Sequence, residues 1–230
     1  ETYELLLFGI DGKVEGWISY YWIPEDRYLQ LYEFNINRGT KQALAELLKT
    51  IETKFAGYTA YFGFPGDNQE AIHFLSEHGF QCIEQDWNHS FFFDGYTAKE
   101  HDDCIEKIFR YNFDKFRRVY HEDPDTYWNA DRIFETIDDW TIFVYNQADQ
   151  PIAAVFLTGK DGYYEIYGSE FADEVFNESV FRELLTASLS ECKCLDAKYM
   201  TYFCAEDEKS VLGELGFQCV GQYVLYIKEL

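Results

Sequence analysis

The chain has 230 residues, of which 47% are hydrophobic and 20% aromatic, enough to bury two modest cores. Its formal net charge is -23, and acidic residues outnumber basic ones in both halves, which argues against nucleic acid because phosphate contacts need basic side chains. No stretch reaches the roughly 18 apolar residues of a membrane span, so we expect a cytoplasmic protein without membrane contact. The acidic surface favours a cationic substrate such as an amine, although solubility alone explains the charge equally well.

The first half of the chain predicts three strands, a helix, a strand, a second helix and a final strand. Asp11 and Gly12 lie between alternating apolar segments and form the strongest hairpin signal, which separates the first two strands. Leu44, Leu47 and Ile51 repeat with helical spacing and indicate a helix with one buried face. The expected strands cover residues 3–10, 13–23, 28–35, 58–64 and 80–93, and the expected helices cover residues 40–55 and 68–78.

The second half opens with segments that the first half lacks. Apolar residues between Ile105 and Tyr120 repeat with helical spacing and predict a helix over residues 99–121, followed by a second helical segment at 128–137. The order of the first half then recurs. The expected strands cover residues 141–146, 152–158, 163–167, 199–204 and a segment from 217, and the expected helices cover residues 177–192 and 209–215.

A short sequence occurs twice, as GFQCI at residues 79–83 and as GFQCV at residues 216–220, and each copy ends a helix and opens a strand. At the same spacing, the capping residue Thr40 corresponds to Asn177, and the apolar stripes of the two following helices coincide. The repeat predicts one α/β fold used twice. We therefore expect two domains, which cover residues 1–97 and 98–230.

The segment NQEAIHFLSEHGF at residues 68–80 combines an asparagine, an alanine, an isoleucine and a terminal Gly-Phe pair. Together with the order of elements, it resembles the acetyl-CoA-dependent N-acetyltransferases of the GNAT superfamily, over nearly the whole chain. The resemblance implies an α/β fold (an α+β mixed sheet) in two tandem acyl-CoA N-acyltransferase (GNAT-like) domains. The alternative interpretation of the segment is an amphipathic helix that ends at a glycine, which many α/β proteins contain.

The loop before the helix at 40–55 corresponds to the family's cofactor-binding pattern, Arg/Gln-x-x-Gly-x-Gly/Ala. In this chain the loop reads RGTKQA at residues 38–43, so its arginine and alanine fit the pattern and a lysine replaces a glycine. Backbone N–H groups at such a helix N-terminus hold the pyrophosphate of acetyl-CoA. The resemblance implies acetyl-CoA contacts from Phe34, Asn35, Ile36, Arg38, Gly39, Thr40, Lys41, Gln42, Ala43 and Asn68.

The corresponding stretch of the second half is VFNESV at residues 175–180, which contains neither glycine nor arginine. Glu178 within it would repel a phosphate. Counting back from Gly216 also places Ala205 where the first copy has Asn68. Acetyl-CoA is therefore expected in the first domain only, with the second domain as a scaffold or a lid on the substrate side.

As the resemblance implies, the chemistry is acyl transfer to an amine, which needs a base for the amine proton and often an acid for the leaving thiolate. Glu33 is the candidate base, with a surface carboxylate as the alternative interpretation. Backbone N–H groups at residues 34–36 are expected to polarise the thioester carbonyl. The tyrosine that often serves as the acid falls at Leu75, which leaves Tyr32, Tyr61 or solvent for that role.

The sequence therefore predicts transfer of an acetyl group to a primary amine of a small molecule or a peptide. No metal is expected, because the six cysteines show no CxxC spacing. A catalytically inactive binding or interaction module on the same fold is the alternative, motivated by Lys41 and Leu75. Monomer and homodimer both stay open, because the strand edges of such domains often pair between copies.

Overall fold

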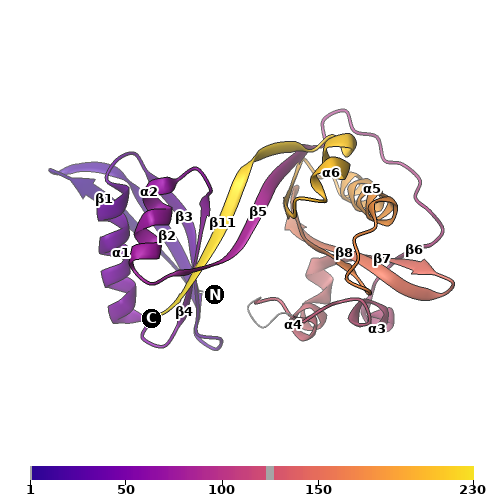
Figure 1. The fold of residues 1–230 in the computed structure, drawn as a ribbon, viewed down its shortest axis with the longest axis horizontal. Coiled ribbons are helices and arrows are strands. Elements are labelled where there is room, and N and C mark those ends of the chain that lie inside the picture. Colours follow the sequence, from indigo (N-terminus) through magenta and orange to yellow (C-terminus); the bar gives the residue numbers. More distant parts are fainter. Residues whose placement is uncertain (1, 123–126) are drawn as a thin grey trace. The chain divides into compact units, whose positions relative to one another are not determined.

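The computed structural model describes residues 2–122 and 127–230. The chain divides into two compact units, one made of Glu1–Gln85 with Gly221–Leu230 and the other of Asp86–Val220 (Figure 1). Each unit contains a mixed sheet and helices, as the α/β class predicted from the sequence requires.

The first unit contains the first four strands and both helices expected from the first half of the sequence, with ends that differ by at most one residue. Its elements are β1 Thr2–Ile10, β2 Lys13–Ile23, β3 Tyr28–Ile36, α1 Thr40–Lys54, β4 Thr59–Pro65 and α2 Gln69–Glu77. The strand order is β1-β2-β3-β4, followed by β11 Gln218–Glu229 from the end of the chain. β1, β2 and β3 pair antiparallel, β4 runs parallel to β3, and β11 runs antiparallel to β4.

Both helices of the first unit pack on one face of its sheet. Leu44, Leu47 and Ile51 of α1 are almost completely buried against sheet residues such as Phe62, and Leu75 of α2 joins the same cluster. Burial of a leucine or isoleucine side chain stabilises a fold by about 1.5–3 kcal/mol. The opposite face keeps large apolar side chains exposed, namely Tyr3, Leu5, Leu7, Trp17 and Tyr32.

The last strand of each sequence repeat belongs to the unit built by the other repeat. Residues 223–229 of β11 pair with β4 in the first unit, whereas residues 87–92 of β5, Gln81–Phe92, pair with β10 in the second. Figure 1 labels β11, drawn in yellow, beside the strands of the first unit. The repeat placed the domain boundary between 97 and 98, whereas the compact units follow this exchange of strands.

The second unit repeats the same order of elements after two short helices. Its strand order is β5-β10-β9-β8-β7-β6. In this order β9 and β10 are parallel, and the other neighbouring strands are antiparallel. The elements are β6 Ile105–Lys107, α3 Asp114–Arg117, α4 Ala130–Glu135, β7 Trp140–Gln147, β8 Gln150–Lys160, β9 Tyr163–Phe171, α5 Glu178–Cys194, β10 Tyr199–Cys204 and α6 Lys209–Leu215.

The prediction of one helix over residues 99–121 is wrong. The segment forms β6, a short 3-10 helix and α3, because Ile105 and Lys107 take sheet positions opposite Tyr145 and Phe143. The side chain of Asn112 then accepts a hydrogen bond from the Phe109 N–H at 2.6 Å, which favours a turn over a continuous helix. The helix expected at 128–137 is shorter than predicted and forms α4.

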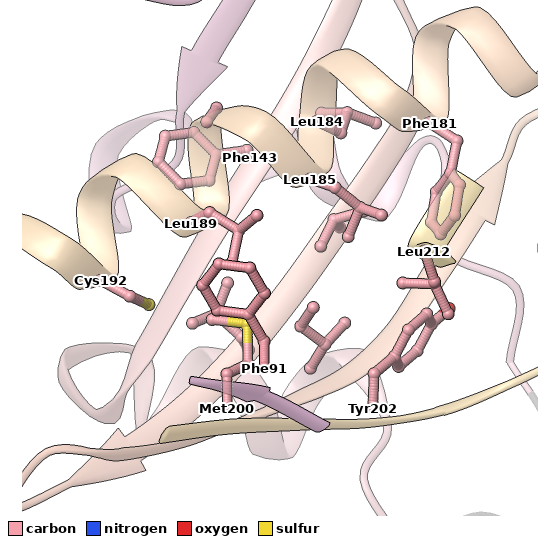
Figure 2. Close-up of a cluster of buried hydrophobic side chains, with 14 of the residues drawn as sticks. Phe91, Phe143, Phe181, Leu184, Leu185, Leu189, Cys192, Met200, Tyr202 and Leu212 are labelled. Atoms are coloured by element: carbon pink, nitrogen blue, oxygen red, sulfur yellow. The ribbon is translucent and has the colours of Figure 1, made fainter. Parts of the chain in front are cut away.

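Two clusters of buried side chains hold the second unit together, one on each face of its sheet. Figure 2 shows Phe181, Leu185 and Leu189 of α5 pointing toward Met200 and Tyr202 of β10. On the other face, a cluster that includes residues of α3 and α4 covers β7 and β8. The second unit therefore has three layers, with the sheet between α5 on one face and α3 and α4 on the other. The cluster on the face of α3 and α4 consists of Ile108, Phe113, Phe116, Val119, Ala130, Ile133, Ile137, Trp140, Ile142, Val144, Ala154 and Phe156.

The described helices include none that is long and apolar enough to cross a membrane. Across residues 2–122 and 127–230, no group of three or more His, Cys, Asp or Glu side chains is arranged to hold a metal ion. The six cysteines are free thiols.

Candidate functional site

The first unit has a break in its sheet at the place where the sequence predicts the acetyl-CoA site. β3 and β4 pair only through Tyr28–Leu29–Gln30 and Thr59–Ala60–Tyr61, and no further pairs between them occur among the described residues. The second part of β3, which contains the predicted residues 34–36, is paired with β2 alone. Its backbone groups on the β4 side therefore have no strand partner.

α1 follows β3 in the sequence, and Gly39, not the expected Thr40, is its N-cap residue. The φ angle of Gly39 is 81°, a left-handed conformation that other residues rarely adopt, and a Cβ there would lie 2.9 Å from Cδ1 of Ile10. The N-cap residue forms no side-chain hydrogen bond to the helix, and the first turn contains no acidic residue. The N-terminus thus offers N–H groups and a positive dipole end to an anion.

Arg38 is held beside this helix start by the neighbouring strand. Its guanidinium donates to Oε1 of Glu15 at 2.6 Å, and the N–H of Asn37 donates to the backbone carbonyl of Glu15 at 2.9 Å. Glu15 is buried, whereas 61% of the Arg38 side chain is exposed. The ion pair occupies only part of the guanidinium's donors, so Arg38 can still bind an anion at the surface.

Lys41, which replaces a glycine of the family pattern, has helical backbone geometry. The lysine is exposed and needs no left-handed conformation, so its presence does not strain the loop. The N–H of Lys41 donates to Oε1 of Glu70 on α2 at 3.4 Å. A carboxylate therefore lies close to the position that a phosphate would take.

The other residues of the loop differ in how far they are exposed, as expected at the start of an amphipathic helix. Gln42 donates a hydrogen bond to Glu46, Thr40 is half-buried, and Ala43 is fully buried in the core. Asn68 caps α2, because its side chain accepts a hydrogen bond from the Ala71 N–H at 3.2 Å.

Glu33 lies on the face of the sheet opposite to α1 and α2. Its carboxylate accepts hydrogen bonds from the Ser19 hydroxyl at 3.0 Å and from the Trp17 indole N–H at 3.3 Å. Tyr32 is the extra residue of a β-bulge, since Leu31 and Glu33 pair with successive residues of β2. The bulge places Tyr32, 65% exposed, directly beside Glu33.

The other predicted residues of β3 alternate between the two faces. Phe34 is half-buried with its ring centroid 5.3 Å from that of Phe64, and Ile36 packs against the same core, whereas Asn35 is exposed. Tyr61, an alternative acid, stacks on Tyr28 with centroids 4.6 Å apart.

The start of α5, which corresponds to the start of α1, has a side-chain cap and an acidic residue in its first turn. Asn177 caps α5 by accepting a hydrogen bond from the Val180 N–H at 3.2 Å, and Glu178 occupies the first turn. Glu178 binds Arg182 one turn later. A phosphate would meet a capped and acidic helix N-terminus here.

Glu208 fills the space between the diverging ends of β9 and β10. Its carboxylate accepts hydrogen bonds from Ser169 at 2.6 Å, from Tyr202 at 2.8 Å and from the Ala205 N–H at 2.9 Å. Burial raises the pKa of Glu208. Glu208 takes the N-cap position of α6, as Asn68 does for α2, although counting along the sequence places Ala205 opposite Asn68.

Two acidic residues of the second unit were not predicted as functional residues. Glu208 follows an acidic run, and Glu165 alternates with Tyr163 and Tyr167 along one strand, so each resembles an ordinary surface residue in the sequence. The structure buries Glu208 and leaves Glu165 half-buried. An acidic residue between aromatic residues of one strand face is the signal that could have marked Glu165.

No protein-family model and no curated protein matches the sequence. Solved structures do match the fold. A GCN5-related N-acetyltransferase from Sphaerobacter thermophilus is similar over 95% of this chain and 78% of its own, with a TM-score of 0.66 and 15% sequence identity. A GCN5-related N-acetyltransferase from Kribbella flavida is similar over 94% of this chain and 88% of its own, with a TM-score of 0.60 and 13% identity.

A third similar structure is a tandem GNAT protein from the clavulanic acid biosynthesis pathway. The similarity extends over 99% of this chain and 83% of that protein, with a TM-score of 0.59 and 12% identity. Likeness at such identities defines the fold, whereas function depends on the site. The chain therefore has the α/β fold of the GNAT acyl-CoA N-acyltransferases, in two tandem copies.

Proposed function

We propose that the chain is an acetyl-CoA-dependent N-acetyltransferase of the cytoplasm whose first unit holds the cofactor. The observation that carries the proposal is the start of α1, where Arg38 and Lys41 accompany a helix whose N-cap residue Gly39 has no side chain and whose first turn contains no acidic residue. Helix N-termini of this kind bind phosphate groups through backbone N–H groups and the helix dipole. The GNAT fold of the chain adds the expectation of acetyl transfer.

The residues present fit the phosphates of acetyl-CoA. The N–H groups of Thr40, Lys41 and Gln42 belong to the first turn, and the partly exposed Arg38 adds a guanidinium beside them. The acyl thioester would lie along β3, where residues 34–36 have no partner strand on the β4 side. When bound, acetyl-CoA supplies an activated acetyl group.

The chain's own contribution to the chemistry is the removal of a proton from the acceptor amine. Glu33 is held in place by Trp17 and Ser19 and faces away from the helices, so it can accept that proton directly or through water. Tyr32 presents an exposed hydroxyl next to it and is the candidate acid. The acceptor is a primary amine of a small molecule or a peptide, to which the acidic surface is favourable.

Glu33→Gln keeps both hydrogen bonds to the side-chain oxygen but removes the base. We expect kcat for amine acetylation to fall by about 10²-fold or more. Binding of acetyl-CoA, measured by calorimetry, should stay within about twofold, because Glu33 does not contact the cofactor loop. Glu77→Gln, at an exposed site on α2, is the control. An unchanged kcat in Glu33→Gln would remove Glu33 from the mechanism.

Glu70→Gln should tighten binding of acetyl-CoA. The carboxylate of Glu70 lies 3.4 Å from the Lys41 N–H and repels any phosphate that approaches it. Loss of one charge at a helix N-terminus changes binding by about 0.3–1 kcal/mol, or about two- to fivefold. Calorimetry of the variant against Glu77→Gln measures the effect. Weaker binding in Glu70→Gln would show that Glu70 supports the cofactor instead of competing with it.

A non-catalytic binding or interaction module on the same fold is the second candidate. Leu75, which occupies the place of a proton-donating tyrosine in the family, is fully buried and offers no acid. This candidate predicts that no amine in a broad panel is acetylated. Turnover of any amine that disappears in Glu33→Gln would decide in favour of the enzyme.

A further inference from the structure

The second unit contains a cavity of about 700 Å³ that has no role in the proposed acetyl transfer. It opens on the sheet face that α3 and α4 partly cover, above the first residues of β9 and β10. These residues still pair with each other, so the cavity lies apart from the diverging strand ends that Glu208 fills. Its lining consists of Trp128, Thr136, Asp139, Trp140, Thr158, Gly159, Lys160, Tyr163, Tyr164, Glu165, Tyr199 and Thr201.

Glu165 lies in the floor of this cavity between two threonines. The strand register places Thr158 on one side of Glu165 and Thr201 on the other, so all three share one face of the sheet. Both threonine hydroxyls donate elsewhere, Thr158 to the carbonyl of Asp139 at 2.9 Å and Thr201 to Oδ1 of Asn88 at 3.0 Å. Neither hydroxyl proton is therefore available to the carboxylate.

The carboxylate of Glu165 has no hydrogen bond or ion pair within residues 2–122 and 127–230. The titratable groups that line the cavity with it are Asp139, Lys160, Tyr163, Tyr164 and Tyr199. Lys160 is the only cation in this lining, and it is exposed and forms no ion pair with the carboxylate. Burial alone raises the pKa of Glu165 to about 7. A half-buried carboxylate without a partner gains from any cation that enters the cavity.

Strands on both sides of β9, the strand that contains Glu165, contribute aromatic rings to the cavity. Trp140 belongs to β7 and contacts Trp128 with ring centroids 5.2 Å apart, while Tyr199 belongs to β10 and contacts Tyr163 at 6.2 Å. The faces of aromatic rings attract cations and repel anions. The cavity thus combines a negative charge at its floor with rings in its walls, a combination that suits an organic cation.

The first unit uses the corresponding position differently. Gln30 occupies the register position of Glu165, because it pairs with β4 as Glu165 pairs with β10. The side-chain oxygen of Gln30 accepts hydrogen bonds from the hydroxyls of Tyr21 and Tyr28. At this register position the first repeat has a neutral side chain with hydrogen-bond partners, and the second has an acidic side chain without a partner.

We propose that the cavity of the second unit is a binding site for an organic ammonium ion, held by Glu165 and by the rings of Trp128, Trp140 and Tyr199. The ammonium group donates a charge-assisted hydrogen bond to the carboxylate, and the apolar part of the ligand packs on the rings. Binding needs no acyl donor, so the site stands independently of the acetyl transfer proposed for the first unit.

The first test is calorimetry with phenethylammonium at pH 8 in the absence of acetyl-CoA. We expect one saturable site, with binding about tenfold weaker at pH 6 because a proton then competes for Glu165. The uncharged analogue 2-phenylethanol should bind at least about tenfold more weakly, since it lacks the charge. Equal affinity for the amine and the alcohol would overturn the proposal.

The second test uses Glu165→Gln, which has the same shape as glutamate and reproduces the side chain of Gln30. We expect it to lose at least about tenfold in affinity for phenethylammonium at pH 8 and to lose the pH dependence. Asp139→Asn, which removes another carboxylate of the lining, should stay within about threefold. Circular dichroism checks that both variants fold. The proposal fails if Glu165→Gln binds like the wild type, or if phenethylammonium, butylammonium and choline all fail to saturate the folded wild type at about 10 mM.

Discussion

A chain truncated after Val220 loses the folded first unit and keeps the folded second unit. The deleted residues supply the strand that pairs with all of β4, and they remove Val224 and Tyr226 from the core of the first unit. Burial of two such side chains stabilises a unit by about 3–6 kcal/mol, a large share of the 5–15 kcal/mol that holds a typical domain together. Hydrogen exchange should show lost protection in β1 to β4 and retained protection in β8 and β10.

Two valines of β11 provide the matched control for this prediction. Val224 is 5% exposed in the first unit, whereas Val220 is 64% exposed. Val224→Asp places a charge in the core and should destabilise the first unit nearly as much as the truncation. Val220→Asp should leave its stability within about 0.5 kcal/mol of the wild type. Equal stability of the two variants would contradict the placement of β11 in the first unit.

At pH 8, Glu165→Gln is more stable than the wild type by about 2–3 kcal/mol. Burial in the folded protein raises the pKa of Glu165 from its ordinary value of 4.5 to about 7. Such a shift favours the folded state below pH 4.5, and the wild type loses this stability as the pH rises from 4.5 through 7. A glutamine has no charge to bury, so the variant does not show this loss.

Urea denaturation of the wild type and of Glu165→Gln at pH 4.5 and pH 8 measures this difference. Near pH 4.5 the two proteins should agree within about 0.5 kcal/mol, because the folded protein then holds Glu165 in its neutral form. Equal stabilities at pH 8 would mean that the carboxylate of Glu165 is solvated in the folded protein.

The strands and helices of the first half could be predicted because each follows a simple local pattern. Alternation predicts β1 to β3, and the spacing of Leu44, Leu47 and Ile51 predicts α1. The prediction of a helix at 99–121 was wrong because it also relied on a local pattern. Apolar spacing alone cannot distinguish a helix from short segments, one of which pairs with a strand far along the chain. Ile105 and Lys107 pair with residues of β7, and only the tertiary structure contains that information.

The exchange of β5 and β11 could not be predicted from the sequence. Both strands begin with almost the same residues, GFQCI and GFQCV, so local sequence allows either strand to complete either unit. The choice depends on side chains further along, such as Val224 and Tyr226, which fill the core beside β4. A pattern of alternating apolar residues does not say against which core those side chains pack.

The proposed cofactor loop could be recognised in the sequence because its pattern is continuous along the chain. The residues that modulate it lie elsewhere, since Glu15 comes from β2 and Glu70 from α2. Glu165 and Glu208 were missed for a similar reason, because their environments are made by strands and helices far apart in the sequence. Contacts between distant segments therefore decide which acidic residues are solvated and which are buried.

The most direct test of the proposed function is calorimetric titration of the purified protein with acetyl-CoA. We expect saturable one-to-one binding that Arg38→Glu weakens by about ten- to hundredfold, the range for loss of a hydrogen bond to a charged group. Lys49→Glu makes the same charge change on an exposed site further along α1 and should leave affinity nearly unchanged. Glu15→Gln frees Arg38 from its ion pair without removing the cation, so binding should be retained. No saturable binding by the wild type, or equal affinities of Arg38→Glu and Lys49→Glu, would contradict an acetyl-CoA site in the first unit.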